Sequence, residues 1–272
     1  MINSFFNQIK ILTGAFVVLV TLISPSSLNA SNDGYTSTTL ITGANRGIGF
    51  EFAKQYLSKG WKVIATCRKP ESADQLILLQ EKFPTLLIID RLDVTDHSQI
   101  DQLAEKYAGT PIDVLLNNAG ISGDTKNQIF GRMNYDVYEK VLAVNTIGPL
   151  KMAEAFYPHV KASKQKKIIT VSSSEGSIAT ADKRGGGRLF FYRSSKSALN
   201  MVMVNLALQL KNRGVAVGMI NPGATDTDFM TGLPFPLRKT EVAVSDMIRN
   251  IDSITVENTG AYLNYNGKTV PW

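Results

Sequence analysis

The stretch Thr42-Gly43-Ala44-Asn45-Arg46-Gly47-Ile48-Gly49 decides the predicted fold, because it joins a short β-branched run to a longer amphipathic one. Residues 38–42 are typical of a buried strand, and the pattern after the glycines predicts a helix over 48–59. Glycines at such a turn permit positive φ and let the backbone approach a phosphate, which the N–H groups and dipole of the helix N-terminus stabilise. A tight strand-to-helix turn contains glycine whether or not a ligand binds to it. The position of this turn after the first strand nevertheless favours a phosphate-binding turn.

The same alternation of short β-branched runs and amphipathic stretches continues along the chain. Strands are expected at 38–42, 62–66, 86–90, 113–117, 167–172, 215–221 and 261–263, and helices at 48–59, 72–82, 97–107, 134–162 (one helix or two), 192–212 and 240–251. Alternating strands and helices predict an α/β fold: a doubly wound parallel β-sheet of about seven strands with helices on both faces, in three α/β/α layers. In such sheets ligands bind beyond the carboxyl ends of the strands.

The composition fits one folded domain over residues 31–272. Of the 272 residues, 44% are hydrophobic and 19% are charged, which excludes a disordered chain. The net charge of +6 suits an anionic ligand without requiring nucleic acid, and no nucleic-acid partner is expected. The nearest approach to a basic run is interpreted as a solvated helix end; it comprises Lys161, Lys164, Lys166 and Lys167.

The scarcity of cysteine and histidine excludes further classes of protein. Cys67 is the single cysteine, so no internal disulfide is expected, and His97 and His159 are the only histidines. Zinc sites need three or four closely placed ligands, so no metal is expected. A Ser-His-Asp hydrolase is disfavoured, because His97 reads as a helix start and His159 follows Pro158 on a polar turn, which predicts both at the surface.

Residues 1–30 differ in character from the rest of the chain. Lys10 is their only charged side chain, and the apolar run Ile11 to Ile23 is followed by the polar stretch 24–30 that ends at Ala30. This order is typical of a signal peptide. A retained anchor that attaches the protein to a membrane and a misassigned start codon are the alternatives.

The end of the second strand bears on the choice of cofactor. A protein that selects an unphosphorylated adenosine ribose usually places Asp or Glu there, but this strand ends in Thr66-Cys67-Arg68. Arg46 in the glycine turn and Arg68 can instead converge on a 2′-phosphate, to which a guanidinium is well suited. This pair favours NADP(H) over NAD(H), and two surface arginines without a ligand are the alternative.

Polar residues also follow the third and fourth strands, where the adenine and ribose of a cofactor would pass. Asp93-Val94 follows one strand and Asn117-Asn118-Ala119-Gly120 the other. Each alone is ordinary turn chemistry, but their combined position supports a dinucleotide.

Tyr192 and Lys196 are spaced i, i+4 on a predicted helix, so both side chains project from one face. An ammonium close to a tyrosine stabilises the phenolate and lowers its pKa toward the working range of an acid–base catalyst. Ser173 follows the fifth strand and can donate a hydrogen bond to a carbonyl oxygen. Together these three residues form the predicted catalytic set.

The order of these motifs resembles that of the short-chain dehydrogenase/reductase family, and the resemblance covers residues 38–272. The motifs are Thr42-Gly43-xxx-Gly47-x-Gly49, Asn117-Asn118-Ala119-Gly120, Ser172-Ser173, Tyr192-xxx-Lys196 and Pro222-Gly223. The resemblance implies a Rossmann-type sheet, a nicotinamide cofactor and hydride transfer between that cofactor and a small-molecule carbonyl or alcohol. The ending Tyr265-Asn266-Gly267-Lys268-Thr269-Val270-Pro271-Trp272 is similar to that of the branch containing C-factor and sniffer carbonyl reductases.

The resemblance also implies roles for single residues. Asn145 would hold a water behind Lys196, which would also bind the nicotinamide ribose, and Thr227 would contact the carboxamide. The full set expected at the cofactor is Gly43, Asn45, Arg46, Gly47, Ile48, Gly49, Arg68, Asp93, Val94, Asn117, Ala119, Gly120, Tyr192, Lys196, Pro222, Gly223, Thr225 and Thr227.

Several features depart from the common family pattern or leave alternatives open. The interval from Ser173 to Tyr192 is long, so Ser172 or Ser174 could take the serine role if the register shifts. The segment 224–240 is rich in apolar residues and proline; it is interpreted either as a lid over an apolar carbonyl compound or as a packed loop. The resemblance implies assembly into a homodimer or homotetramer through the helix that carries Tyr192.

The sequence leaves two interpretations open for the location of the protein and two for its activity. The leader suggests export or membrane association, whereas NADPH is an intracellular reductant, so localisation is left open. The alternative to an enzyme is an NADP-binding regulatory or interaction protein with little catalysis. The presence of Asn145, Ser173, Tyr192 and Lys196 together favours the enzyme.

Overall fold

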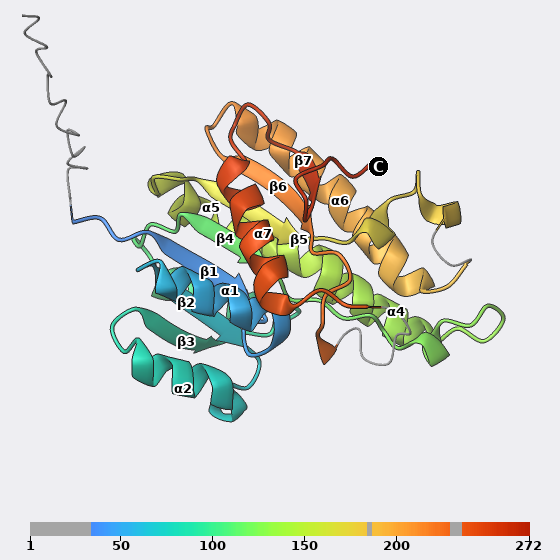
Figure 1. The fold of residues 1–272 in the computed structure, drawn as a ribbon, viewed down its shortest axis with the longest axis horizontal. Helices are drawn as coiled ribbons and strands as arrows, with labels where there is room; N and C mark the ends of the chain where they lie inside the picture. Colours follow the sequence, from blue (N-terminus) through green and yellow to red (C-terminus); the bar gives the residue numbers. More distant parts are fainter. Residues whose placement is uncertain (1–33, 184–186, 229–235) are drawn as a thin grey trace, which may run out of the picture. The chain divides into compact units, whose positions relative to one another are not determined.

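Seven parallel strands form one sheet in the order β3-β2-β1-β4-β5-β6-β7 in the computed structural model, which describes residues 34–183, 187–228 and 236–272 (Figure 1). The strands are β1 (Thr38–Thr42), β2 (Lys62–Cys67), β3 (Leu87–Arg91), β4 (Val114–Asn117), β5 (Lys167–Val171), β6 (Ala216–Asn221) and β7 (Ala261–Asn264). The order reverses between β1 and β4, which makes the carboxyl ends of these two strands the switch point. The predicted doubly wound sheet of seven strands is confirmed.

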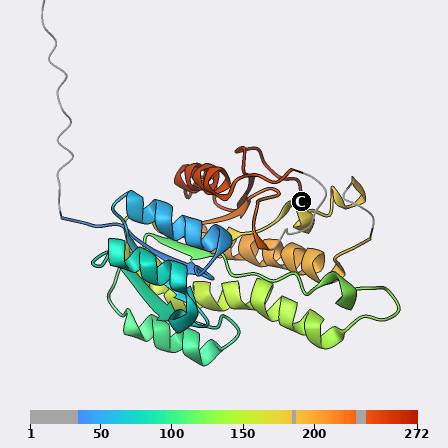
Figure 2. The ribbon, with the colours of Figure 1, turned by 60° about the horizontal axis from the view of Figure 1, so that its bottom comes forward.

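Helices cover both faces of the sheet (Figure 2). They bury the side chains of the sheet in two clusters. The helices are α1 (Gly47–Ser58), α2 (Asp74–Lys82), α3 (His97–Lys106), α4 (Tyr135–Leu142), α5 (Gly148–Ala162), α6 (Phe190–Lys211) and α7 (Thr240–Ser253). One cluster joins α3, α5 and α6 to the sheet, for example through Phe156 and Met203. The other joins α1, α2 and α7 through residues such as Phe52 and Met247. Strands β1, β4, β5 and β6 are buried along their whole length, which explains why their sequences read as continuous apolar runs.

The predicted helix over 134–162 is interrupted. A π-helical segment, η3 (Ala143–Ile147), separates α4 from α5. A π-turn adds one residue to the helical repeat and turns the following side chains by part of a turn, and such insertions often occur at functional sites. Asn145 lies at the centre of this segment and is completely buried.

Two surface predictions are wrong. Pro158 lies inside α5 and not on a turn, so His159 is buried; its Nε2 lies 3.0 Å from the carbonyl oxygen of Ala104. Lys167 begins β5 and is also buried, because its Nζ donates to the carbonyl oxygens of Ile251 (2.8 Å) and Asp252 (3.0 Å) at the end of α7. An ammonium at a helix C-terminus satisfies free carbonyls and opposes the negative end of the dipole.

The leader predicted over residues 1–30 lies outside the residues that the structure describes. In the described part of the chain, no helix has the length and apolar character needed to cross a membrane. The same part holds no cluster of His, Cys, Asp or Glu side chains suited to a metal ion.

Candidate active site

The glycine-rich turn after β1 has a shape that small residues alone allow. Gly43 (φ +66°) and Gly47 (φ +55°) both lie in the left-handed region. A Cβ on Gly49 would collide with the carbonyl oxygen of Gly43, and a Cβ on Gly43 would lie 3.0 Å from the Cα of Ala119. The turn therefore presents bare backbone at the switch point, which the close approach of a pyrophosphate requires.

Asn118 joins this turn to the end of β4. Its Nδ2 donates to the carbonyl oxygens of Thr42 (2.9 Å) and Gly43 (3.1 Å). The hydroxyl of Thr42 in turn accepts hydrogen bonds of 3.0 Å from the N–H groups of Asn118 and Ala119. The sequence prediction placed its neighbours Asn117, Ala119 and Gly120 at the cofactor and omitted Asn118, whose role is to hold the two strand ends together.

The N-terminus of α1 fits an anion. Arg46 is its N-cap residue and makes no capping hydrogen bond, and the first turn contains no acidic residue. The first N–H groups of a helix have no partner within the helix, so these donors and the helix dipole favour a phosphate. Asn45 and Ile48 are half-buried in the same turn. Thr227 closes it from the other side, since a Cβ on Gly47 would lie 3.4 Å from its methyl group. These features fit the pyrophosphate of a dinucleotide.

The two arginines expected at a 2′-phosphate are exposed and have neighbours that the sequence did not predict. The Nη1 of Arg46 lies 3.1 Å from a carboxylate oxygen of Asp228, with the two side chains 70% and 76% exposed. Such an exposed pair contributes little stability. The carbonyl oxygen of Arg68 accepts a 2.9 Å hydrogen bond from the guanidinium of Arg91. Arg91 is the last residue of β3 and is paired with Cys67 in the sheet register. Arg91 thus fixes the backbone that presents Arg68.

Asp93 follows β3 and is held as a carboxylate. Burial raises its pKa, but hydrogen bonds from the N–H (3.0 Å) and hydroxyl (2.7 Å) of Thr95, together with the charge of Arg68, produce a net lowering of the pKa. Val94 is buried, and its carbonyl oxygen would lie 2.8 Å from a Cβ on Gly148, the first residue of α5. The glycine therefore lets α5 begin directly against the strand end.

Ser173 and Tyr192 meet beyond the end of β5. The phenol of Tyr192, in the first turn of α6, is hydrogen-bonded to the side chain of Ser173. The preceding serine is occupied elsewhere, since the hydroxyl of Ser172 donates to Oδ1 of Asn200 at 2.6 Å. Of the serines that the sequence left open, Ser173 is the one that the structure brings to Tyr192.

Lys196 lies one turn further along α6 and is 4% exposed. Its Nζ donates to the carbonyl oxygen of Val171 at 2.9 Å and lies 5.8 Å from the ring centroid of Tyr192. A Cβ on Gly120 would lie 3.7 Å from this Nζ and 3.5 Å from Oδ1 of Asn145. The turn after β4, the π-helical segment and α6 therefore converge on one place.

Asn145 is fixed by three hydrogen bonds. Its Oδ1 accepts from the N–H of Ile121 at 2.9 Å, and its Nδ2 donates to the carbonyl oxygen of Ile121 at 2.8 Å and to the hydroxyl of Ser195 at 3.0 Å. Both ends of the amide are used, so its orientation is determined. The Ser195 contact also attaches the π-helical segment to α6.

The pKa values of the tyrosine and lysine are shifted by burial. Burial raises the pKa of Tyr192 to about 12; the hydrogen bond from Ser173 opposes this, and Glu175 and Tyr262 add to it. Burial lowers the pKa of Lys196 to about 8. The sequence predicted that Lys196 lowers the pKa of Tyr192. The pKa is raised instead, because desolvation of the phenol is the largest effect on it.

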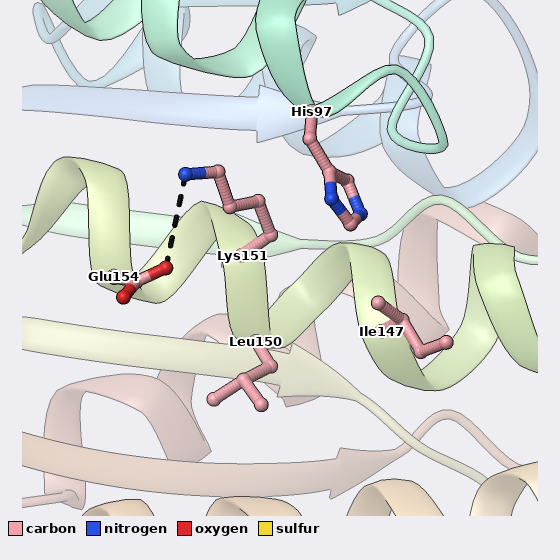
Figure 3. Close-up of a pocket in the computed structure, with 5 residues that line it drawn as sticks. All are labelled: His97, Ile147, Leu150, Lys151 and Glu154. Carbon is pink, nitrogen blue, oxygen red and sulfur yellow. Dashed lines mark ion pairs between the residues drawn. The ribbon is translucent and has the colours of Figure 1, made fainter.

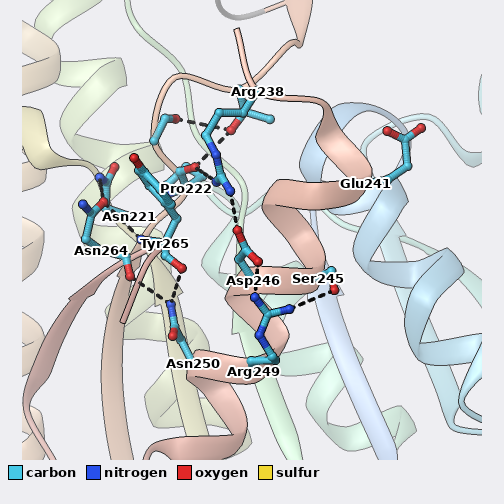
Figure 4. A network of polar contacts seen from close by, with 12 residues as sticks. Asn221, Pro222, Arg238, Glu241, Ser245, Asp246, Arg249, Asn250, Asn264 and Tyr265 are labelled. Atoms are coloured by element: carbon cyan, nitrogen blue, oxygen red, sulfur yellow. Dashed lines mark hydrogen bonds and ion pairs between the residues drawn. The ribbon is translucent and has the colours of Figure 1, made fainter. Parts of the chain in front are cut away.

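The turn after β6 is held from two sides (Figure 4). Arg238 donates to the carbonyl oxygen of Pro222 at 3.0 Å, and its guanidinium carbon lies 3.9 Å from the ring centroid of Tyr265. A Cβ on Gly223 would lie 2.7 Å from that ring, and Asp246 of α7 forms an ion pair with Arg238. The Pro222-Gly223 turn therefore depends on contacts with α7 and the segment after β7.

The segment predicted as a lid or packed loop is closed at its base. Thr225 and Arg238 form a parallel bridge, with hydrogen bonds of 2.8 Å from Asp226 N–H to the carbonyl oxygen of Arg238 and from Arg238 N–H to that of Ala224. Thr225 is buried, and its hydroxyl donates to Pro222 at 3.2 Å. The apolar residues Phe229, Met230, Leu233 and Phe235, on which the lid prediction depends, lie outside the described residues.

A shallow surface depression of about 290 Å³ lies at the start of α3 and on α5 (Figure 3). It is lined by His97, Ile147, Leu150, Lys151 and Glu154. It is open and contains an ion pair, with Lys151 Nζ 3.7 Å from the carboxylate of Glu154. None of the catalytic candidates lines it, so the convergence of residues at the strand ends identifies the site better than the depression does.

The geometry at the switch point is that of an α/β enzyme that binds a dinucleotide. Residues 37–234 match the family described as short chain dehydrogenase, and the chain belongs to this family. It is thus an oxidoreductase that acts on CH–OH or C=O groups with NAD(P), as the sequence predicted.

Three relatives illustrate the likeness. An NADPH-bound carbonyl reductase from chicken fatty liver is 31% identical, with a TM-score of 0.80, and the match covers 87% of this chain and 99% of that chain. The carbonyl reductase Sniffer of D. melanogaster is 26% identical, with a TM-score of 0.78, over 88% of this chain and 100% of that chain. C-signal of Myxococcus xanthus is 33% identical over 60% of this chain and 93% of its own length. The predicted likeness to the C-factor and sniffer branch is confirmed.

Proposed function

We propose that the protein reduces the carbonyl group of a small molecule with NADPH, with Tyr192 as general acid. The observation that carries the proposal is the hydrogen bond between Tyr192 and Ser173 beside the buried Lys196, at the carboxyl ends of the strands. A phenol, a hydroxyl and an ammonium on separate elements converge there next to a turn that fits a pyrophosphate. The cofactor, when bound, supplies the hydride.

Each of the three side chains has a defined task in reduction. The raised pKa of Tyr192 keeps the phenol protonated at neutral pH, so it can donate a proton to the carbonyl oxygen. The Ser173 hydroxyl donates a second hydrogen bond, which polarises that oxygen. The phenolate that remains is stabilised by Ser173 and by the charge of Lys196, whose Nζ is already oriented by Val171. Asn145 is proposed to hold a water behind Lys196.

The cofactor is proposed to lie across the ends of β1, β4 and β6. The turn 43–49 would hold the pyrophosphate, Arg46 and Arg68 the 2′-phosphate, and Asp93, Val94, Asn117, Ala119 and Gly120 the adenosine and its ribose. Lys196 would bind the nicotinamide ribose, and the turn from Pro222 to Thr227, including Gly223 and Thr225, the carboxamide. Preference for NADP(H) over NAD(H) is supported by the two arginines and by the NADPH in the chicken carbonyl reductase.

The test is consumption of NADPH and NADH by residues 31–272 with a panel of aldehydes, ketones and quinones. Tyr192→Phe is the matched control, because it removes only the phenolic oxygen. Turnover that Tyr192→Phe abolishes without weakening NADPH binding supports the proposal. Tight NADPH binding without turnover on any substrate would instead support the regulatory protein, and absence of binding to either nucleotide would overturn both.

Cofactor preference has its own test. Arg46→Ala and Arg68→Ala should each raise the KM for NADPH several-fold and leave the KM for NADH unchanged, because only NADPH carries the 2′-phosphate. Equal effects on both nucleotides would contradict this assignment.

Self-association is proposed through α6. Met201 and Leu208 of this helix are 63% and 69% exposed. Exposed apolar side chains on one helix support contact with a second copy. Light scattering should give the mass of a dimer or tetramer, and Met201→Lys should reduce it.

A further inference from the structure

Tyr262 of β7 reaches the active site from two strands away. It pairs with Met219 of β6 in the sheet register, is 1% exposed, and its hydroxyl donates to the carbonyl oxygen of Ser173. The same carbonyl accepts a 2.8 Å hydrogen bond from the N–H of Gly176. The peptide of Ser173 is thus held on one side by its own turn and on the other by a core tyrosine.

Tyr262 is itself fixed by the returning end of the chain. After β7 the chain turns back, so that Leu263 bridges Thr269 and the N–H of Val270 donates to the carbonyl oxygen of Tyr262 at 2.8 Å. The ring of Trp272 stacks on the ring of Tyr262, with centroids 5.2 Å apart and an interplanar angle of 27°. The phenol therefore points at Ser173 from a rigid support.

The same chain end also holds the far side of the serine segment. The backbone oxygen of Trp272 accepts hydrogen bonds from the N–H of Ala179 at 2.6 Å and from the hydroxyl of Ser177 at 3.5 Å. Gly176, in the middle, packs against α6, since a Cβ there would lie 2.8 Å from the backbone of Lys196. Residues 173–179 are thus attached at both ends to β7 and the residues that follow it.

We infer that Tyr262 is a positioning residue for the reaction: its hydroxyl orients the peptide of Ser173 and so sets the Ser173 side chain against Tyr192. This inference rests on the proposed function. A displaced serine would neither polarise the carbonyl oxygen nor stabilise the phenolate of Tyr192. Displacement of a reacting group by about 1 Å can cost a hundredfold in rate, so loss of one anchoring hydrogen bond should be visible in kcat.

Tyr262→Phe tests the inference, because it removes the hydroxyl and keeps the ring that stacks on Trp272. We expect kcat to fall about tenfold, with the KM for NADPH unchanged. The matched control is Tyr107→Phe, a tyrosine of the same core cluster whose hydroxyl donates to Asp90, far from the serine in the fold. It should leave kcat unchanged.

A double-mutant cycle separates positioning from general packing. If Tyr262 acts through Ser173, then Tyr262→Phe should change kcat less than twofold in a Ser173→Ala background. An equal fall in kcat in both backgrounds, or no fall in the wild-type background, would overturn the inference.

Amide hydrogen exchange of residues 174–179 provides a measurement without turnover. Tyr262→Phe should speed exchange at Gly176, whose N–H shares the Ser173 carbonyl, and Tyr107→Phe should not. Unchanged exchange would overturn the inference. If the wild-type protein has no Tyr192-dependent turnover, the proposed function fails, while exchange still shows whether Tyr262 holds the serine segment.

Discussion

Lys196→Met should make the protein more stable at neutral pH while removing the ammonium that the proposed reaction uses. Burial lowers the pKa of Lys196 from 10.5 to about 8, which means that the folded protein disfavours the charged form. At about 1.4 kcal/mol for each tenfold change in proton affinity, this cost is about 3 kcal/mol. The methionine would give up the hydrogen bond to Val171, worth about 1 kcal/mol, so the net gain is about 2 kcal/mol.

The dependence on pH identifies the cause. Below pH 8 the lysine is charged in the folded and unfolded chains, so the full cost is present. Between pH 8 and 10.5 the unfolded chain binds more protons than the folded one, so the stability of the wild type rises with pH. The advantage of Lys196→Met should therefore shrink by about 2 kcal/mol between pH 7 and 9.5. The pKa of Tyr192 is raised to about 12, so titration of its phenol lowers the stability of the protein only above pH 10, outside this range.

Urea unfolding of the wild type and of Lys196→Met at pH 7 and 9.5 is the assay, with Lys211→Met as control. Lys211 lies at the exposed end of the same helix, so its replacement should leave the free energy of unfolding nearly unchanged at both pH values. A lower free energy of unfolding for Lys196→Met at pH 7, or an advantage independent of pH, would refute the reasoning. A functional side chain often lowers the stability of the fold, so a variant that removes it can be more stable than the wild type.

Three further predictions follow from the contacts around the site. Gly49→Ala should destabilise the fold by about 3 kcal/mol or prevent folding, because its Cβ would overlap the rigid carbonyl of Gly43; thermal unfolding without cofactor measures this, and an unchanged Tm would contradict it. Arg238→Gln should raise the dissociation constant for NADPH several-fold, measured by cofactor fluorescence, since the Pro222 turn loses its anchor. Asp228→Asn should tighten NADPH binding about twofold and leave NADH binding unchanged, because it frees Arg46; a loss of affinity would show that the ion pair supports the site.

The elements could be predicted from the sequence to within one or two residues, because period and turn residues are local signals. Strand β1 and the start of α3 are found where they were expected. The π-helical segment 143–147 could not be predicted, since its residues differ little from those of an α-helix. His159 was misplaced for a similar reason: Pro158 suggested a turn, but the surrounding helix and the contact of His159 with Ala104 outweigh that local preference.

Three of the contacts that sequence reasoning missed share one chemical feature: their acceptors are backbone carbonyls. Asn118 donates to Gly43, Arg238 to Pro222, and Tyr262 to Ser173. Any residue supplies a backbone carbonyl, so the acceptor cannot be recognised from the sequence. The donor lies as many as 89 positions away, so no local pattern points to it either. The catalytic candidates, by contrast, depend on side-chain identity and on their position at strand ends, which the sequence carries directly. The residues that hold such a site in place are therefore found only once the chain is folded, and their hydroxyl and guanidinium groups are the ones to test by single-atom substitutions such as Tyr262→Phe.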